Sequence, residues 1–174
     1  MALSYNAGMT NTSGNTKTPN ASTRNSKIIK APIEDLYRAF TDPGALEVWQ
    51  APGEMTATVH EFDLRIGGGY KMSLLYPESE SEARGKTAPR EDRFTAQFLE
   101  LTPVTRIVEA IRFDSADPAF SKMMFMIVMF EPKDDATEVT ILFENIPEGI
   151  SKADNEAGTR SSLEKLARYV EQSN

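Results

Sequence analysis

The segment of about residues 151–172 most constrains the fold, because it has the pattern of a long helix with two unlike halves. Its second half carries apolar residues at helical spacing, namely Leu163, Leu166, Ala167 and Val170. Continued toward the amino end, the same face is polar and consists of Arg160, Thr159, Glu156 and Lys152. The apolar half is therefore expected to lie on a core. The polar half either reaches the edge of the protein or lines the mouth of a pocket through Glu156, Thr159 and Arg160.

The start of this helix is marked by a capping pattern. Ser151 can accept a hydrogen bond from the first turn, and Asp154 lies three residues on, where its carboxylate can reach back. Gly158 lies inside the helix, at a cost of about 1 kcal/mol relative to alanine. The sequence alone indicates no packing role for this glycine.

The rest of the chain has mainly the pattern of strands. A short strand at 27–30 is followed by two short helices between Pro32 and about Trp49. Six further strands are expected at 55–62, 70–76, 94–101, 106–113, 122–130 and 137–144. This order predicts an α+β fold in which a curved antiparallel sheet of about six to seven strands wraps around the C-terminal helix. The short helices would close one end of the concave side, which leaves room for a pocket at the other.

Three segments outside these elements have their own signals. Residues 1–25 are rich in Asn, Thr, Ser and Gly, which predicts a flexible tail and leaves 26–174 as a single domain. The segment 77–92 is polar and predicts an exposed loop. Gly67, Gly68 and Gly69 indicate a turn or bulge rather than a phosphate loop, because no Gly-Lys-Ser/Thr motif follows and a strand comes next.

Composition excludes several classes of function. A net charge of -7 argues against binding to nucleic acid or to an anionic membrane surface. The absence of cysteine excludes disulfides and thiolate sites, and a single histidine excludes a histidine-rich metal site. We expect no metal and no cofactor. No apolar run is long enough to insert stably in a membrane, and the N-terminus lacks a secretion signal, so we expect a cytoplasmic protein.

Several short motifs, in their order and spacing, carry a resemblance to a known family. They are Ala31-Pro32, Tyr37-x-Ala39-Phe40-Thr41-Asp42-Pro43, Trp49, the run from His60 to Tyr70, and Asn155-Glu156-Ala157-Gly158 followed by Leu163 and Leu166. Over about residues 26–172 the chain resembles the AHSA-type branch of the START-like, or SRPBCC, superfamily. That branch is named after the C-terminal domain of the activator of heat-shock protein 90 ATPase.

The resemblance implies the helix-grip fold and a hydrophobic cavity between the sheet and the last helix. Many members carry a His-x-x-Gly-Trp motif in that helix, where this chain has Asn155 in place of His and Thr159 in place of Trp. Threonine would leave a roomier and more polar pocket. The family has no shared catalytic residues, so the fold does not settle the function.

A concentration of methionine and aromatic residues, together with polar residues of the last helix, forms the predicted ligand site. Methionine adapts to irregular apolar surfaces, so these side chains could line a cavity or simply fill the core. The predicted ligand-binding residues are Trp49, Met55, Tyr70, Met72, Phe94, Phe98, Glu109, Phe113, Met124, Met126, Phe143, Glu156, Thr159, Arg160 and Leu163.

Two ionisable residues on predicted strands need an explanation. Glu109 shares a face with apolar residues, so it is either buried, with Arg160 or Arg112 as partner or with a raised pKa, or solvated on an edge strand. His60 is predicted to share a face with Phe62, opposite Glu61, and to be structural or exposed rather than catalytic. Asp63 and Arg65 are expected to form an ion pair beside the glycine turn.

Three functions remain open from the sequence. The first is binding of a small hydrophobic or amphipathic molecule between the sheet and the helix. The second is a cyclase or dehydratase acting on a polyketide-like substrate, which requires two of Glu109, Glu156, Arg160 and Tyr70 to meet in one cavity. The third is a chaperone ATPase-activating module. The resemblance also allows a homodimer through an exposed edge or face of the sheet.

Overall fold

A computed structural model describes residues 20–172. The elements are, in order, β1 (Thr23–Ile29), α1 (Ile33–Thr41), α2 (Pro43–Trp49), β2 (Thr56–Asp63), β3 (Gly69–Leu75), β4 (Glu91–Thr102), β5 (Arg106–Phe113), β6 (Met124–Lys133), β7 (Ala136–Glu144) and α3 (Lys152–Glu171). Short 3-10 turns lie at Glu78–Glu80 and Pro118–Phe120. Of the predicted tail, residues 1–19 lie outside the described residues.

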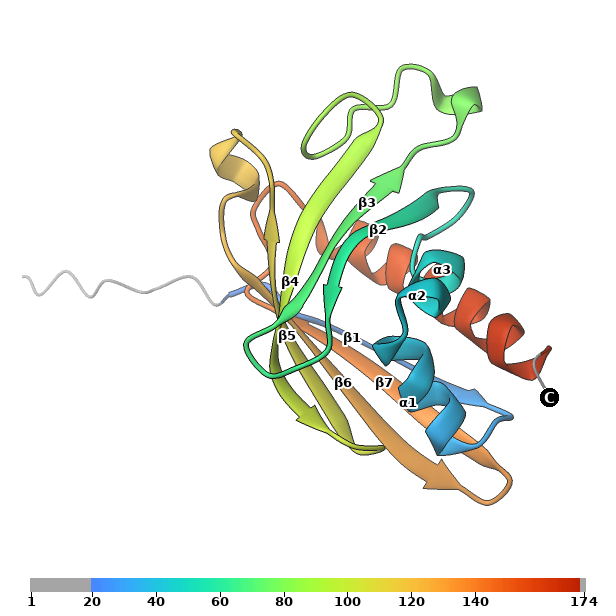
Figure 1. Ribbon diagram of the computed structural model, residues 1–174. Coiled ribbons are helices and arrows are strands. Elements are labelled where there is room, and N and C mark those ends of the chain that lie inside the picture. The colour runs from blue at the N-terminus through green and yellow to red at the C-terminus, as the bar shows by residue number, and fades with distance from the viewer. Residues whose placement is uncertain (1–19, 173–174) are drawn as a thin grey trace, which may run out of the picture.

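The seven strands form one sheet in the order β1-β7-β6-β5-β4-β3-β2, and every neighbouring pair is antiparallel. The sheet is curved, and α3 crosses its concave side with α1 and α2 beside it (Figure 1). β3 and β4 extend beyond the helices to the long connection 76–90. The predicted α+β helix-grip fold is therefore confirmed.

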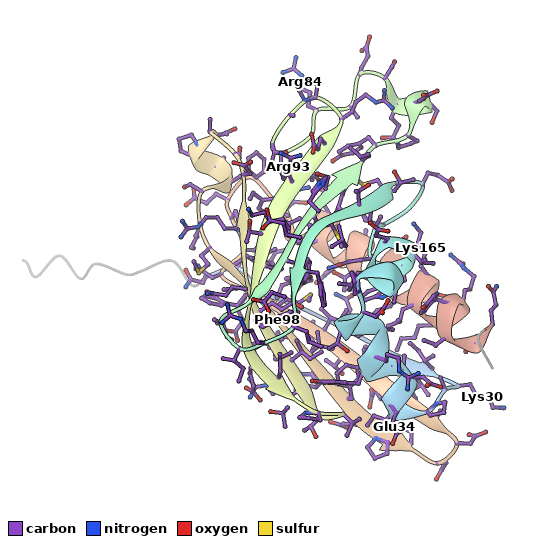
Figure 2. The ribbon with its side chains drawn as sticks, viewed as in Figure 1. Lys30, Glu34, Arg84, Arg93, Phe98 and Lys165 are labelled. Atoms are coloured by element: carbon purple, nitrogen blue, oxygen red, sulfur yellow. The ribbon has the colours of Figure 1, made fainter. Side chains whose placement is uncertain are left out.

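The core lies between the concave face of the sheet and the apolar half of α3. Alternate residues of β3, β4 and β6, such as Met72, Phe98 and Val128, are fully buried there, as period-two strands require. Leu163 and Leu166 meet them from α3 and are no more than 1% exposed. Figure 2 shows Phe98 in this crowded interior and Lys30, Glu34 and Arg84 at the periphery.

Side-chain hydrogen bonds hold α3 at its first turn and, farther along, against the segment after α2. The Ser151 hydroxyl accepts from the Asp154 backbone N–H at 3.0 Å, which confirms the predicted cap of α3. Farther along α3, Ser162 Oγ donates to the Gln50 carbonyl at 2.7 Å, and Lys165 Nζ donates to the Ala51 carbonyl at 2.5 Å. These bonds hold the segment after α2 against α3.

The structure corrects two predicted boundaries. β1 begins at Thr23, four residues earlier than predicted, because the polar residues from Thr23 to Ser26 pair with β7. The exposed loop was predicted to run to Asp92, but β4 begins at Glu91, and Asp92 is only 2% exposed. This carboxylate is buried because Lys86 of the loop binds it.

The prediction that His60 shares a face with Phe62 is wrong. β2 has a bulge between Val59 and Glu61, so His60 is the additional residue in the strand. His60 and Glu61 therefore both lie on the convex face, where His60 Nε2 is 2.8 Å from Ser73 Oγ. Phe62 faces the core and stacks with Tyr70.

The glycine turn is confirmed. Gly67 has φ +82°, and Gly69, with φ +155°, lies so close to β4 that an added Cβ would be 1.9 Å from the Ala96 carbonyl oxygen. The predicted ion pair beside it is also present, with Arg65 Nε 2.7 Å from Asp63 Oδ2.

Candidate functional site

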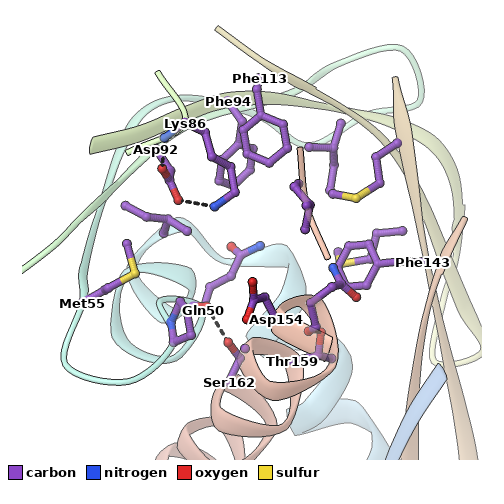
Figure 3. Close-up of a pocket in the computed structure, with 18 of the residues that line it drawn as sticks. Gln50, Met55, Lys86, Asp92, Phe94, Phe113, Phe143, Asp154, Thr159 and Ser162 are labelled. Carbon is purple, nitrogen blue, oxygen red and sulfur yellow. Dashed lines mark hydrogen bonds and ion pairs between the residues drawn. The ribbon is translucent and has the colours of Figure 1, made fainter. Parts of the chain in front are cut away.

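A cavity of about 490 Å³ lies between the concave face of the sheet and the first half of α3. Its walls come from β3 to β7, from the segment after α2, from the 76–90 connection and from α3 (Figure 3). It is lined by Trp49, Gln50, Pro52, Met55, Leu74, Tyr76, Arg84, Lys86, Asp92, Phe94, Ile111, Phe113, Phe120, Met124, Met126, Ile141, Phe143, Gly149, Ile150, Asp154, Asn155, Gly158, Thr159 and Ser162. The polar half of α3 thus faces a cavity.

The wall formed by α3 differs in detail from the predicted one. Thr159 lines the cavity, whereas Glu156 is half-buried outside it and Arg160 is exposed. The cavity face of the helix instead includes Asp154, Asn155, Gly158 and Ser162. Apolar periodicity locates the buried stripe but does not tell on which side of that stripe the sheet leaves space. Gly158 therefore has a role that the sequence did not indicate, since the absence of a side chain enlarges the cavity.

The cavity brings together most of the predicted methionine and aromatic residues. The predicted residues that line it are Trp49, Met55, Phe94, Phe113, Met124, Met126, Phe143 and Thr159. Four other predicted residues are fully buried in the adjoining core and do not line it, namely Tyr70, Met72, Phe98 and Leu163. The eight lining residues give the cavity a mainly apolar wall.

One wall of the cavity is held by an ion pair between the half-buried Lys86 and the buried Asp92, which sequence reasoning missed. Lys86 Nζ is 2.6 Å from Asp92 Oδ2, and the Lys86 backbone N–H donates to Asp92 Oδ1, also at 2.6 Å. The ammonium also lies 5.6 Å from the centre of the Phe113 ring. Burial, and secondarily Asp92, raise the pKa of Tyr76 to about 12. The pair fastens the 76–90 connection over the cavity, as Figure 3 shows.

A second polar group lies behind the cavity wall. Gln50, which lines the cavity, donates from Nε2 to Tyr70 Oη at 3.2 Å, and Tyr70 Oη donates to Glu109 Oε2 at 2.8 Å. Glu109 is 1% exposed on β5, between β4 and β6, so the edge-strand interpretation is wrong. Burial raises the pKa of Glu109 to about 7, partly offset by the Tyr70 hydrogen bond. The same burial, followed by the nearby Glu109 charge, raises the pKa of Tyr70 well above its ordinary range.

The predicted cationic partners of Glu109 are not part of this group. Arg160 is exposed on α3, and Arg112 lies on the convex face of β5. Tyr70 takes their place as the hydrogen-bond partner of Glu109, and Gln50 in turn donates to Tyr70. Gln50 follows the last turn of α2, where no sequence pattern marks it. Within residues 20–172, no cluster of three or more His, Asp or Glu side chains is placed to hold a metal ion. No helix of the same region is long and apolar enough to cross a membrane.

Comparison with known proteins agrees with this architecture. A family model described as Activator of Hsp90 ATPase homolog 1-like protein matches residues 30–171, which confirms the resemblance seen in the sequence. No curated protein matches the chain.

Solved structures with the same fold include a crystal structure of protein CV1439 from Chromobacterium violaceum. It is 33% identical with a TM-score of 0.77, over 86% of this chain and 96% of that chain. Protein Mll3558 from Rhizobium loti is 25% identical with a TM-score of 0.65, over 86% and 96% of the two chains. A protein from Arthrobacter aurescens, at 18% identity and a TM-score of 0.73 over 87% and 86%, shows the fold alone.

Proposed function

The chain belongs to the family of activator of Hsp90 ATPase homolog 1-like proteins, and on that premise we propose that it binds a small hydrophobic or amphipathic molecule in the cavity between the sheet and α3. The resemblance to this family implies a hydrophobic cavity between the sheet and the last helix, the place where this cavity lies. The observation that carries the proposal is the cavity itself, which is mainly apolar and lies where the polar half of α3 faces the sheet.

The size and the lining of the cavity favour a ligand over simple core packing. Small-molecule sites have volumes of about 300–1,000 Å³ and combine apolar walls with a few polar groups. A cavity of about 490 Å³ lies within that range. Met55, Met124 and Met126 supply flexible apolar contacts, and Gln50, Asn155 and Thr159 supply hydrogen-bonding groups.

A matched pair of variants tests the proposal. Thr159→Phe places a large side chain in the cavity, whereas Ala157→Phe places the same side chain on the exposed face of α3 two residues away. The neutral probe N-phenyl-1-naphthylamine, whose fluorescence rises in apolar surroundings, is titrated into each protein. We expect Thr159→Phe to weaken binding by at least about tenfold, equivalent to about 1.4 kcal/mol, and Ala157→Phe to have little effect. Absence of saturable binding to the unmodified chain, or equal binding by all three proteins, would contradict the proposal.

The structure gives less support to the cyclase or dehydratase alternative. Two of its four candidate residues, Tyr70 and Glu109, are within hydrogen-bond distance, but they lie behind the cavity wall rather than on it. Glu156 and Arg160 lie outside the cavity. A general acid or base must reach the reacting atoms directly or through one water, so we favour binding over catalysis.

A further inference from the structure

The group formed by Gln50, Tyr70 and Glu109 has more hydrogen-bond acceptors than donors. Tyr70 donates to one oxygen of Glu109 and receives the Gln50 amide N–H. The other carboxyl oxygen, Glu109 Oε1, is buried and receives no hydrogen bond from the described residues, and the same is true of Gln50 Oε1. A buried acceptor without a donor costs about 1–3 kcal/mol, and more when it is charged. The group therefore lacks a donor.

Among the residues that the structure describes, no cation faces Glu109. Its strand neighbours are Phe98 on β4 and Met126 on β6, and its hydrogen-bond partner Tyr70 is the titratable group that faces it. The ionisable side chains on the cavity wall are Tyr76, Arg84, Lys86, Asp92 and Asp154. Of the two cations, Lys86 is paired with Asp92, and Arg84 is exposed.

The unpartnered oxygens lie close behind the cavity wall. Met126 on β6 is the cross-strand neighbour of Glu109 on β5, and Met126 lines the cavity. Gln50 also lines the cavity and donates a hydrogen bond to Tyr70, the residue that holds Glu109. A bound molecule reaches the carboxyl group only if one of these two unbranched, flexible side chains rotates. Aromatic rings, among them Phe98 and Phe62, pack around Tyr70.

We propose that Gln50 and Glu109 form a polar subsite at the inner wall of the cavity, and that this subsite takes the hydrogen-bond donor of the ligand, a hydroxyl group or a protonated amine on an apolar body. The subsite rests on the proposed function, because the apolar body occupies the cavity. It assigns the ligand to the alcohols, phenols or organic amines and disfavours carboxylates, whose charge would face that of Glu109.

The subsite has a pH dependence of known sign. Burial raises the pKa of Glu109 to about 7, so the carboxylate predominates at pH 8 and the neutral acid at pH 6. The carboxylate accepts a donor more strongly than the acid does. Ligands with a donor therefore bind more tightly at pH 8, whereas an apolar molecule without polar atoms shows no such step.

A series of naphthalenes tests the inference by calorimetry at pH 6 and pH 8. Naphthalene measures the apolar body alone, 2-naphthol adds a hydroxyl, 2-naphthylmethylamine adds an amine, and 2-naphthoate adds a carboxylate. At pH 8 we expect 2-naphthol or the amine to bind about tenfold or more tightly than naphthalene, as for a hydrogen bond to a charged group. At pH 6 that advantage falls to about threefold or less. If 2-naphthol gains more affinity, the preferred donor of the ligand is a neutral hydroxyl. If the amine gains more, the preferred donor is a cationic ammonium group.

Variants separate Glu109 from the other ionisable groups of the chain. Glu109→Gln is expected to abolish the pH step for the donor, and the matched control Glu131→Gln, an exposed residue of β6, to keep it. The measurements on the unmodified chain decide the question even if Glu109→Gln does not fold. Equal affinity for naphthalene and both donors at pH 8, or tightest binding of 2-naphthoate, would overturn the subsite but leave the proposed function standing. Failure of every compound to bind would remove both.

Discussion

Replacing Glu109 by glutamine should change how the stability of the protein depends on pH. The folded protein buries this carboxyl group at 1% exposure, and within residues 20–172 it has a single hydrogen bond, from Tyr70, and no cation nearby. Glutamine has nearly the same shape but cannot ionise. The comparison between the two proteins therefore isolates the free energy of placing a charge at this position.

The magnitude follows from the pKa of Glu109, which rises from 4.5 to about 7 on folding. Because the folded state binds the proton more tightly than the unfolded state, the free energy of unfolding falls as the pH rises between these values. Each unit of pKa difference corresponds to about 1.4 kcal/mol. The difference between 4.5 and 7 then amounts to a loss of about 3 kcal/mol at pH 8 relative to pH 4.5.

Urea denaturation at pH 4.5, 6, 7 and 8 measures this effect, with both proteins followed by circular dichroism. At each pH we subtract the free energy of unfolding of the unmodified chain from that of Glu109→Gln. This difference should be about 3 kcal/mol larger at pH 8 than at pH 4.5. All other titrating groups are common to the two proteins and cancel in the difference. A difference that does not vary with pH would refute the reasoning, because it would mean that the buried carboxyl group has an ordinary pKa.

Three further predictions concern backbone and loop. Gly158→Ala should raise the free energy of unfolding by about 0.5–1 kcal/mol in thermal melting, because alanine favours the helix interior and the added methyl meets its nearest side-chain atom at 3.7 Å. No gain in melting temperature would contradict it. Gly69→Ala should cost about 3 kcal/mol or more in urea, because its Cβ would lie 1.9 Å from the Ala96 carbonyl oxygen, and a cost below about 1 kcal/mol would contradict that contact. Asp92→Ala should speed trypsin cleavage after Lys86 by about tenfold, since it removes the two hydrogen bonds that hold Lys86, and an unchanged rate would argue against this anchoring.

The sequence predicted the architecture because periodicity reports which faces are buried. The apolar spacing of α3 and its cap at Ser151 located the last helix, and the alternation in β3 located a strand with one buried face. For Glu109, the apolar residues on the same face raised burial as one of two interpretations, and the structure selects it. Local sequence patterns were sufficient to predict burial wherever the periodicity of a residue's own helix or strand determines which way it faces.

Features that depend on contacts between distant segments could not be predicted in this way. The bulge at His60 turns one side chain to the other face without any glycine or proline to mark it. Asp92 looked like part of a polar loop, and its burial results from Lys86 returning to it. Gln50 belongs to the site because it lines the cavity and its amide reaches Tyr70 on β3.

The most direct test of the central claim, that the cavity between sheet and helix holds a small apolar molecule, is a methionine-methyl NMR titration with N-phenyl-1-naphthylamine. Met55, Met124 and Met126 line the cavity, whereas Met129 lies on the convex side of β6. The account predicts saturable shifts of the first three methyl resonances at one equivalent of probe and no shift at Met129. Shifts confined to Met129, or none at all at saturating probe, would contradict it.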